Sequence, residues 1–545
     1  MNGFRRALGA ALCMLVGPCI EPLFAQTGDS LAVSGVMAPL PTLNSPAEDR
    51  FRVDQILGRA PLDDYLIRSP SSRDRRPTGR LSWSLVSPQL TSLWNSELPF
   101  SLNEGSLWAG RGASAMVTGG VRAGVGPVSL ILAPQLVFSQ NLDYQTFPPG
   151  DSTRSLFSSP WHIGAQSADL PQRFGDARLL QLKPGQSTLA VAAGPVTIGG
   201  STENQWWGPG IRNAIVMSNQ AEGIPHLFAR TTRPINTRIG RISAKWIAGA
   251  LTESLFFDSV SANDLRSLSG FVATLQPAIE PNLTLGISRV VYARTNGSGS
   301  LPNHALDALT WWHASELTIP DSLMTPIDTA QAAGHDQLLS LFGRWVFPSD
   351  GFEVYAEWAR AALPSSPIDL VNEPEQTQAY TLGLQWARPV GSAIARVQSE
   401  VSYLEESNAI TDRPGKSYYV SRSVVQGYTQ RGRTIGAAIG PGGSSQWLAL
   451  DYLDPKWRVG AVGGRIRWEN DVYYDKPGRL YLAHDVVVFG GVRGDLRVLG
   501  LDIAGEWIRG KRYNYLFQNP EFEPYGNLGV DRWNTTLRLT ITPLR

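Results

Sequence analysis

From about residue 80 to the C-terminus, apolar and polar residues alternate one by one in segments of about ten residues. In one of these segments Phe352, Val354, Ala356 and Trp358 alternate with Glu353, Tyr355, Glu357 and Ala359. Successive side chains of a β-strand point to opposite faces, so this period predicts strands that are apolar on one face only. Helical periodicity is nearly absent here, and we therefore expect an all-β chain.

Further strands are expected throughout the same region. The candidate segments are 112–124, 127–139, 187–198, 240–252, 268–276, 283–292, 338–347, 379–387, 395–403, 445–453, 462–469, 484–493, 496–507 and 533–541. Turn-forming clusters such as Pro149-Gly150-Asp151 and Gly440-Pro441-Gly442-Gly443 separate them.

The polar face of these strands carries full charges, which distinguishes between all-β architectures. Arg465, Arg467 and Glu469 follow one another on one face of a single segment and are expected to point inward. A packed soluble core excludes such charges, but the wet lumen of a membrane barrel accepts them. No repeat of fixed period favours a propeller or a solenoid. We therefore expect a large antiparallel transmembrane β-barrel over residues 80–545, with inward charges such as Glu353 and Arg467 forming ion pairs across the lumen.

The N-terminus is expected to be a secretory signal peptide covering residues 1–25. Arg5 and Arg6 precede an apolar run that ends near Ile20, and Gln26 is the expected first mature residue. Both cysteines lie inside this segment, which excludes a disulfide framework in the mature chain. The chain has 48 Lys and Arg against 47 Asp and Glu, and a balanced charge makes nucleic acid an unsuitable partner.

Residues 26–79 are polar and lack the period of two, and we expect them to form a periplasmic segment with one short helix. Ser45-Pro46-Ala47-Glu48 has the pattern of a capping box with proline at the first helical position. Gly58 would end that helix. Arg68, Arg73, Arg75 and Arg76 are expected to lie in a solvated connector.

Catalytic motifs are missing from the sequence, so we expect no enzyme, no cofactor and no metal. No HExxH pair and no Gly-x-Ser-x-Gly turn is present. His484 and Asp485 are adjacent, and adjacent residues on a strand face opposite sides. Glu353 and Glu357 would be about 13 Å apart along a strand, too far for paired glycosidase carboxylates.

Trp206 and Trp207 run directly into Gly208-Pro209-Gly210. Because adjacent strand residues point to opposite faces, one indole is expected at the lipid interface and the other toward the lumen or its mouth. A lumen-facing indole would offer a flat apolar surface to a sugar ring. The alternative is that both tryptophans only pack beside a tight turn.

The segment STENQWWGPGIRNAIVMSNQ (201–220) is similar to a segment of the capsule-assembly Wzi family of outer-membrane proteins. Other segments resemble the family in the same order: LWAGRGASAMVTGG (107–120), ADLPQRFG (168–175), EGIPHLFART (222–231), RWVFPSDGFEVYAEWAR (344–360), QAYTLGLQW (378–386), QGYTQRGRTIGAAIGPG (426–442) and HDVVV (484–488). The resemblance implies a barrel of about eighteen strands with a small periplasmic helical element. It also implies a lectin-like role in holding capsular or exopolysaccharide at the cell surface.

On this reading the chain is a non-catalytic protein of the outer membrane, expected to be a monomeric barrel in contact with membrane lipid and surface polysaccharide. The alternative is a diffusion porin of the same fold. The candidate polysaccharide-binding residues are Glu203, Asn204, Trp206, Trp207, Arg212, Tyr428 and Arg431.

Overall fold

A computed structural model describes residues 32–33, 39–62, 65–73, 81–147, 149, 154–162, 167–312, 334–363, 368, 371, 374–375, 377–406, 417–475, 483–517 and 531–544. The expected signal peptide and its cleavage site lie outside these residues, as do Arg75 and Arg76. None of the helices in the described part of the chain is both long enough and apolar enough to cross a membrane.

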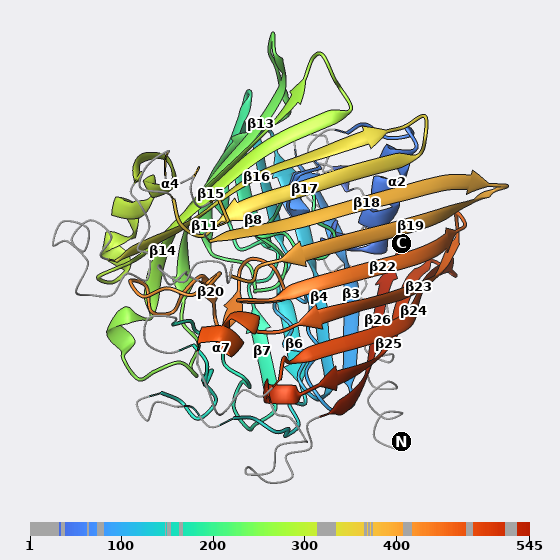
Figure 1. Ribbon diagram of the computed structural model, residues 1–545. Helices are drawn as coiled ribbons and strands as arrows, with labels where there is room; N and C mark the ends of the chain where they lie inside the picture. The colour runs from blue at the N-terminus through green and yellow to red at the C-terminus, as the bar shows by residue number, and fades with distance from the viewer. Residues whose placement is uncertain are drawn as a thin grey trace, which may run out of the picture.

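The wall is one antiparallel sheet closed on itself (Figure 1). Its strands are β3 (Ser82–Asn95), β4 (Gly112–Val125), β5 (Val128–Leu132), β6 (Gln135–Ser139), β7 (Leu179–Lys183), β8 (Thr188–Ala193), β9 (Val196–Ser201), β11 (His226–Thr231), β12 (Ile235–Asn236), β13 (Gly240–Thr252), β14 (Leu265–Pro277), β15 (Leu283–Arg294), β16 (His335–Phe347), β17 (Phe352–Arg360), β18 (Gln378–Val390), β19 (Ala393–Tyr403), β22 (Ser444–Leu453), β23 (Trp457–Arg467), β24 (Val486–Val498), β25 (Leu501–Tyr513) and β26 (Arg532–Pro543).

Closure comes from the pairing of β26 with β3, the last strand with the first strand of the wall. Three wall strands are each interrupted and carry two labels. β5 and β6 both pair with β4, and β11 and β12 both pair with β13. β7 and β8 pair with β6 and β5 in turn and so form one interrupted strand beside them. When each interrupted strand is counted once, the wall has 18 strands, as the resemblance implies.

The remaining elements are short. They are β1 (Ala32–Val33), β2 (Ile67–Arg68), β10 (Trp206–Trp207), β20 (Thr429–Gln430), β21 (Arg433–Thr434), α2 (Pro46–Ile56), α3 (Pro70–Arg73), α4 (Asp307–Thr310), α7 (Asn470–Asp475), η2 (Ser261–Asn263), η3 (Ser298–His304) and η4 (Tyr515–Phe517). β1 runs parallel to the start of β3.

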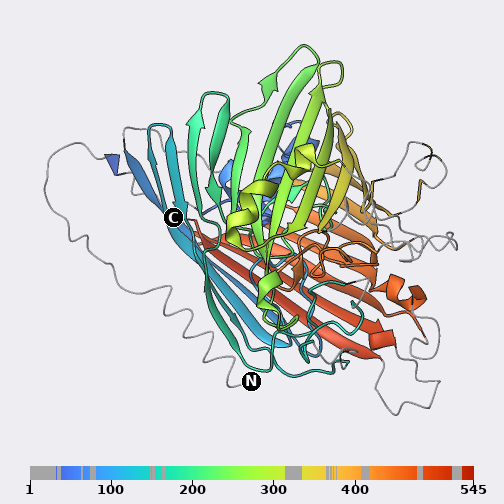
Figure 2. The same cartoon turned by 90° about the vertical axis from the view of Figure 1, so that its left-hand side faces the viewer.

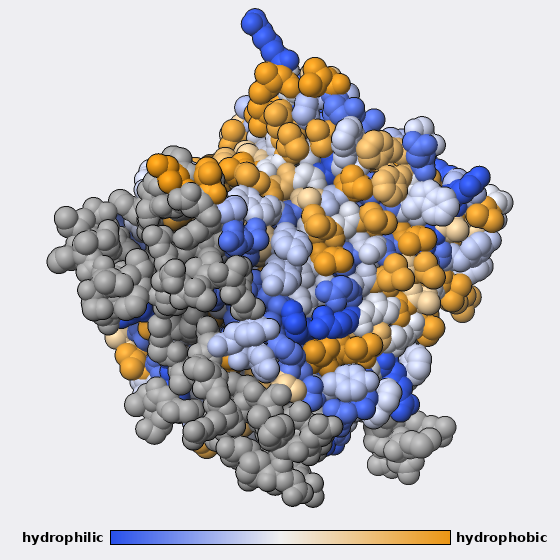
Figure 3. Space-filling model, viewed as in Figure 1, coloured by the Kyte–Doolittle hydropathy of each residue, from blue (hydrophilic) through white to orange (hydrophobic). Residues whose placement is uncertain are grey.

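The expected alternation holds along most strands. On β17 and β19 the polar face is buried inside the barrel, including Glu353, Glu357 and Arg396. Large apolar residues are exposed on the outer face, for example Leu382, Leu384 and Trp386 on β18 and Leu448, Leu450 and Tyr452 on β22. Figure 3 shows hydrophobic residues spread over this outer face. Such a face belongs against lipid.

On β23 the predicted facing is wrong. Trp457, Val459 and Ala461 are exposed, which places residues of odd number outside and Val462 and Ile466 inside. Arg465 and Arg467 therefore share the outer side, where Arg467 pairs with Glu405 and Arg465 donates to Gln446. The inner side is apolar here because it packs against inserted chain rather than water, with Ile466 and Ile439 in one buried cluster.

Two strand boundaries also differ from the prediction. Residues 187–198 were expected to be one strand, but Gly194-Pro195 forms a turn between β8 and β9, with Gly194 at a φ of 61°. Further on, β24 and β25 are longer than expected and meet at Leu499 and Gly500 instead of residues 494–495.

The N-terminal helix forms as predicted. Ser45 caps α2, with its hydroxyl accepting from Glu48 N at 3.2 Å, and Pro46 occupies the first helical position. Gly58 follows the helix with a φ of 69°. The prediction that Arg68 lies in a solvated connector is wrong, because its side chain is buried inside the barrel next to Glu48.

The two ends of the barrel differ in connection length. Turns such as 391–392, 454–456 and 499–500 join strands at one end, and loops such as 404–443 and 468–485 join them at the other. Short turns are periplasmic and long loops are external in outer-membrane barrels, so we assign the ends accordingly. Gly58 lies near Pro348 in a short turn, which places α2 toward the periplasmic end of the lumen.

Candidate functional site

The lumen is filled by three parts of the chain, which we call the lumen plug: α2, residues 202–225 and residues 417–443. Their aromatic side chains are among the most buried of the described residues, including Trp206, Trp207, Tyr418, Tyr419 and Tyr428. The two inserted segments bind each other, because the hydroxyls of Tyr419 and Tyr428 donate to the carbonyls of Ile215 and Val216 at 2.7 and 2.8 Å.

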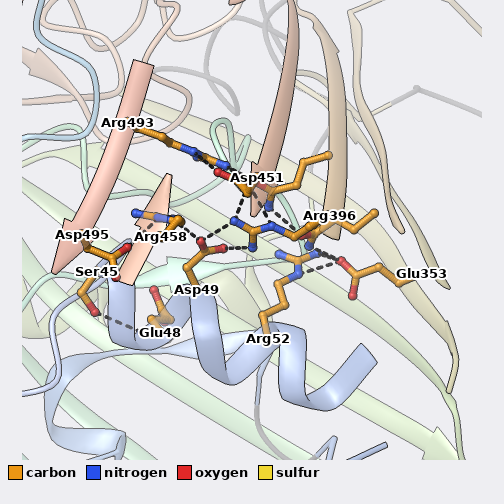
Figure 4. A network of polar contacts seen from close by, with 12 residues as sticks. Ser45, Glu48, Asp49, Arg52, Glu353, Arg396, Asp451, Arg458, Arg493 and Asp495 are labelled. Atoms are coloured by element: carbon orange, nitrogen blue, oxygen red, sulfur yellow. Dashed lines mark hydrogen bonds and ion pairs between the residues drawn. The ribbon is translucent and has the colours of Figure 1, made fainter. Parts of the chain in front are cut away.

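Inward charges of the wall hold the plug. Asp49 of α2 accepts from both terminal nitrogens of Arg396 at 2.7 Å and from Arg458 at 2.7 Å (Figure 4). Arg52 of the same helix donates from Nε to Glu353 at 2.7 Å, and Arg344 donates to the other carboxylate oxygen at 2.8 Å. The predicted ion pairing within the lumen is confirmed for Glu353, with α2 as one partner. It is wrong for Arg465 and Arg467, which lie on the outer side of β23.

Two further carboxylates of the wall bind backbone instead of cations. Glu400 accepts from the N–H groups of Arg212 and Asn213 at 3.0 and 2.9 Å. Glu357 accepts from Ile215 N at 3.1 Å. A segment without regular structure leaves N–H groups unpaired, and buried carboxylates on the wall supply the acceptors.

Trp206 and Trp207 point to opposite sides, as predicted for adjacent strand residues. Trp206 lies under the Arg68 guanidinium at 4.8 Å and donates to Gly210 O at 3.1 Å. Trp207 packs against β14, where a Cβ added at Gly270 would lie 2.8 Å from the indole. Both side chains are 0 % exposed, so neither lies at the lipid interface nor presents a face to the lumen. Their burial agrees with the alternative in which both tryptophans pack beside a tight turn.

The Gly208-Pro209-Gly210 turn after the tryptophans is where the N-terminal segment attaches. Arg52 donates to Pro209 O at 2.8 Å and Arg68 to Gly210 O at 3.0 Å. Gly208 has a φ of 99°, and a Cβ there would lie 3.1 Å from the Glu357 carboxylate. The turn therefore needs glycine both for its backbone and for its close approach to the wall.

Three other candidates also serve the plug. Glu203 accepts from Ser71 N at 2.8 Å and lies 3.6 Å from Lys245. Burial opposes ionisation of Glu203, but Lys245 and the Ser71 N–H outweigh it and lower its pKa. Tyr428 is buried, with its ring stacked on Tyr419. Arg431 is half exposed and pairs with Glu222 at 2.7 Å.

Arg212 and Asn204 line a cavity of about 240 Å³ between α2, the plug and the wall. Arg212 lies 5.3 Å from the ring of Trp447, and Arg493 lies 5.4 Å from the same ring. Glu104, Glu506 and Arg538 also line it. This volume is below the 300–1,000 Å³ of most ligand pockets, so it suits one sugar-sized group rather than a polymer.

An aromatic group at the external end was not found from the sequence. Tyr473 and Tyr474 of α7 lie 4.0 and 5.8 Å from the ring of His484, and Tyr474 is exposed. Burial and the nearby Arg467 and Arg465 lower the pKa of His484, which keeps the ring neutral. Two adjacent tyrosines in the polar stretch NDVYYDKPG were the available signal.

Comparison with known proteins gives a family and a fold. The family described as capsule assembly protein Wzi matches residues 100–456. The structure of Wzi from Escherichia coli, described as an outer membrane protein involved in group 1 capsule assembly and a carbohydrate binding β-barrel, is 11% identical, with a TM-score of 0.53 over 84% of each chain.

Two further solved structures have lower TM-scores. A BenF-like porin from Pseudomonas fluorescens Pf-5 and OpdQ from Pseudomonas aeruginosa match 84% of this chain and 98% of theirs. Their identities are 9% and 8%, with TM-scores of 0.36. No curated protein matches the sequence.

Proposed function

Because the chain belongs to the capsule assembly protein Wzi family and is a β-barrel of the outer membrane, we propose that it binds surface polysaccharide and anchors it at the cell. The observation that carries this proposal is the filled lumen. α2 and the two inserted segments occupy the interior with buried aromatic residues and paired charges, so the barrel offers surfaces for attachment and little space for passage.

The proposed polymer-binding surface is the external aromatic group formed by Tyr473, Tyr474 and His484. Sugar rings have apolar C–H faces that pack on aromatic rings, and the tyrosine hydroxyls can bond sugar hydroxyls. Arg465 lies at the same end of β23, and its guanidinium is partly exposed beside Gln446. A guanidinium there can bind a carboxylate or hydroxyl of the polymer.

Asn204 and Arg212 are proposed to contact a single sugar-sized group in the lumen cavity. Support comes from their position on its wall and from the Trp447 ring, which lies near both Arg212 and Arg493. The other five candidates from the sequence are proposed to act through packing of the plug. We also propose that the protein is non-catalytic and that it is a monomeric barrel in contact with membrane lipid.

The test is retention of polysaccharide by cells that make the organism's own capsular or exopolysaccharide. Tyr474→Ala should release polymer into the medium, and purified Tyr474→Ala barrel should bind the polymer at least about tenfold more weakly, since stacked aromatic contacts contribute roughly 0.5–1.5 kcal/mol and hydrogen bonds add to them. Trp312→Ala, which removes an exposed aromatic residue elsewhere at the external end, is the control.

Arg212→Ala tests the cavity separately, with the exposed Arg178→Ala as its control. Loss of binding in Arg212→Ala alone would move the site into the lumen. Unchanged retention in a folded Tyr474→Ala/Arg212→Ala variant would contradict both parts of the proposed site.

The diffusion porin is the second candidate, and its lumen would have to conduct. Steady open channels of the purified protein in planar bilayers would favour the porin and contradict the anchoring function. We expect a closed barrel.

A further inference from the structure

The loop between β15 and β16 begins with η3 and α4, and these short helices lie against the outer side of the wall (Figure 2). Trp246 of β13 and Ser269 of β14 donate to the carbonyl of Ala305 at 3.0 and 2.7 Å. The same Ser269 hydroxyl accepts from Ala308 N at 3.1 Å. Three hydrogen bonds therefore hold the backbone at Ala305 and Ala308 to the rigid sheet.

Three metal-ligating side chains meet at this fixed segment. His304 ends η3, Asp307 begins α4, and His335 is the first residue of β16. His304 Nδ1 lies 2.9 Å from Asp307 Oδ2, His335 Nε2 lies 3.3 Å from His304 Nδ1, and His335 Nε2 lies 3.4 Å from Asp307 Oδ2. Among the described residues this is the one group of at least three such side chains whose ligand atoms converge.

The orientation of His335 is also fixed. Its ring lies parallel to Trp311, with centroids 5.0 Å apart and planes 14° apart. In this position Nε2 faces His304 and Asp307, while Nδ1 is buried and has no hydrogen-bond partner in the described part of the chain. The ligand side of each ring is thus directed at one point.

These separations match those around a small divalent ion. Zinc bonds of about 2.0–2.1 Å place tetrahedral ligands about 3.3 Å apart and octahedral neighbours about 2.9 Å apart. The three observed distances fall at or near these values. Two imidazoles and one carboxylate are donors that zinc, cobalt, nickel and iron(II) accept.

We propose that His304, Asp307 and His335 form a binding site for a divalent transition-metal ion of the zinc class on the external part of the barrel. All three side chains are between 13 and 20% exposed, so the open coordination position is reachable by water. The ion joins the start of β16 to the η3–α4 segment.

A hydrogen-bonded cluster without an ion is the competing explanation. His304 Nδ1 has two neighbours, Asp307 and His335, and one proton on this nitrogen satisfies only one of them. A divalent ion satisfies all three atoms at once. The two explanations differ in whether the folded barrel binds a metal in a saturable way.

Cobalt(II) reports both binding and geometry, because its visible absorption depends on the ligands. The purified full-length barrel without a polyhistidine tag would be treated with a chelator and titrated with Co²⁺ in detergent. One equivalent should bind with a visible band, and Zn²⁺ should displace it. His304→Ala and His335→Ala should each weaken binding by at least about 100-fold, since losing even an outer-shell partner costs roughly 10–100-fold.

His162→Ala is the matched control, because His162 is an imidazole outside the cluster that pairs with Glu469. Heat-modifiable migration on gels identifies the variants that remain folded. Asp307→Asn is a second variant that keeps the size of the side chain. Absence of saturable Co²⁺ binding up to millimolar concentration, or unchanged affinity in a folded His335→Ala barrel, would overturn the proposal.

Discussion

Arg52 and Glu353 are 301 residues apart in the sequence, yet they form a buried ion pair of 2.6 Å between α2 and the barrel wall. Arg344 and Gln385 complete the coordination of the same carboxylate, at 2.8 and 2.6 Å. Glu353 is fully buried, and its charge acts as an attachment point for the plug.

Glu353→Gln should destabilise the barrel by about 3–5 kcal/mol, because it leaves the Arg52 and Arg344 guanidinium groups buried without their anion. Unfolding in denaturant, monitored by heat-modifiable migration, measures the change. Val354→Ala, at the next position and on the outer face, is the control. Val354→Arg should cost about 2–4 kcal/mol, since it places a charge against lipid. A cost below 1 kcal/mol for Glu353→Gln would show that water reaches this pair.

Asp49→Asn should loosen α2 and produce channel openings in planar bilayers that the unchanged protein lacks. Burial opposes ionisation of Asp49, but Arg396, Arg458 and Arg493 hold its pKa well below its usual 3.8. A carboxyl with a lowered folded-state pKa stabilises above its unfolded pKa and loses that contribution only in acid. The difference in channel opening between Asp49→Asn and the parent should thus be constant from pH 5 to 8. Asp54→Asn, on the same helix, should stay closed.

Trp206→Ala and Trp207→Ala should both impair folding, by about 3–5 kcal/mol each, because both indoles are fully buried in the plug. Trp533→Ala removes an indole that is 56 % exposed on the outer face and should cost less. Thermal stability of the purified barrels compares the three. Normal stability of either plug variant would contradict the packing role of that tryptophan.

Glu253→Gln should raise thermal stability near pH 7 and leave it unchanged near pH 4.5. Burial, together with Asp258, Asp169 and Asp264, raises the pKa of Glu253 to about 7. Between 4.5 and 7 the unfolded chain ionises this group while the folded chain keeps it neutral, so stability falls as the pH rises. Asp350→Asn, an exposed carboxylate in a short turn, is the control. If the difference in thermal stability between Glu253→Gln and the parent did not depend on pH, the raised pKa of Glu253 would be contradicted.

The period of two was enough to predict the barrel and most of its strands, because on most strands one face is apolar and exposed while the other is buried inside the barrel. It was not enough on β23, where Val462 and Ile466 face inward. There the interior is packed by chain from another part of the sequence, and a polar lumen is the wrong assumption. A pattern in one strand carries no information about which loop will cover it.

The candidate site shows the same limit. The sequence singles out Trp206 and Trp207 and predicts their opposite facing, but their partner surfaces come from β2 and β14. Tyr473 and His484 are brought together by a fold-back between two strands, and His304 and His335 by a loop of 30 residues. Neither pair has a spacing that a linear motif describes.

Because α2 precedes the wall in the sequence but binds its later strands, its position constrains the order of assembly. The partners of Arg52, Asp49 and Arg50 lie between 301 and 445 residues further along the chain. Until β17 to β24 are in place, those charges can only remain hydrated, since burying them alone is costly. The expulsion of water from the interior thus waits for the C-terminal half, and an incomplete barrel keeps its first helix undocked.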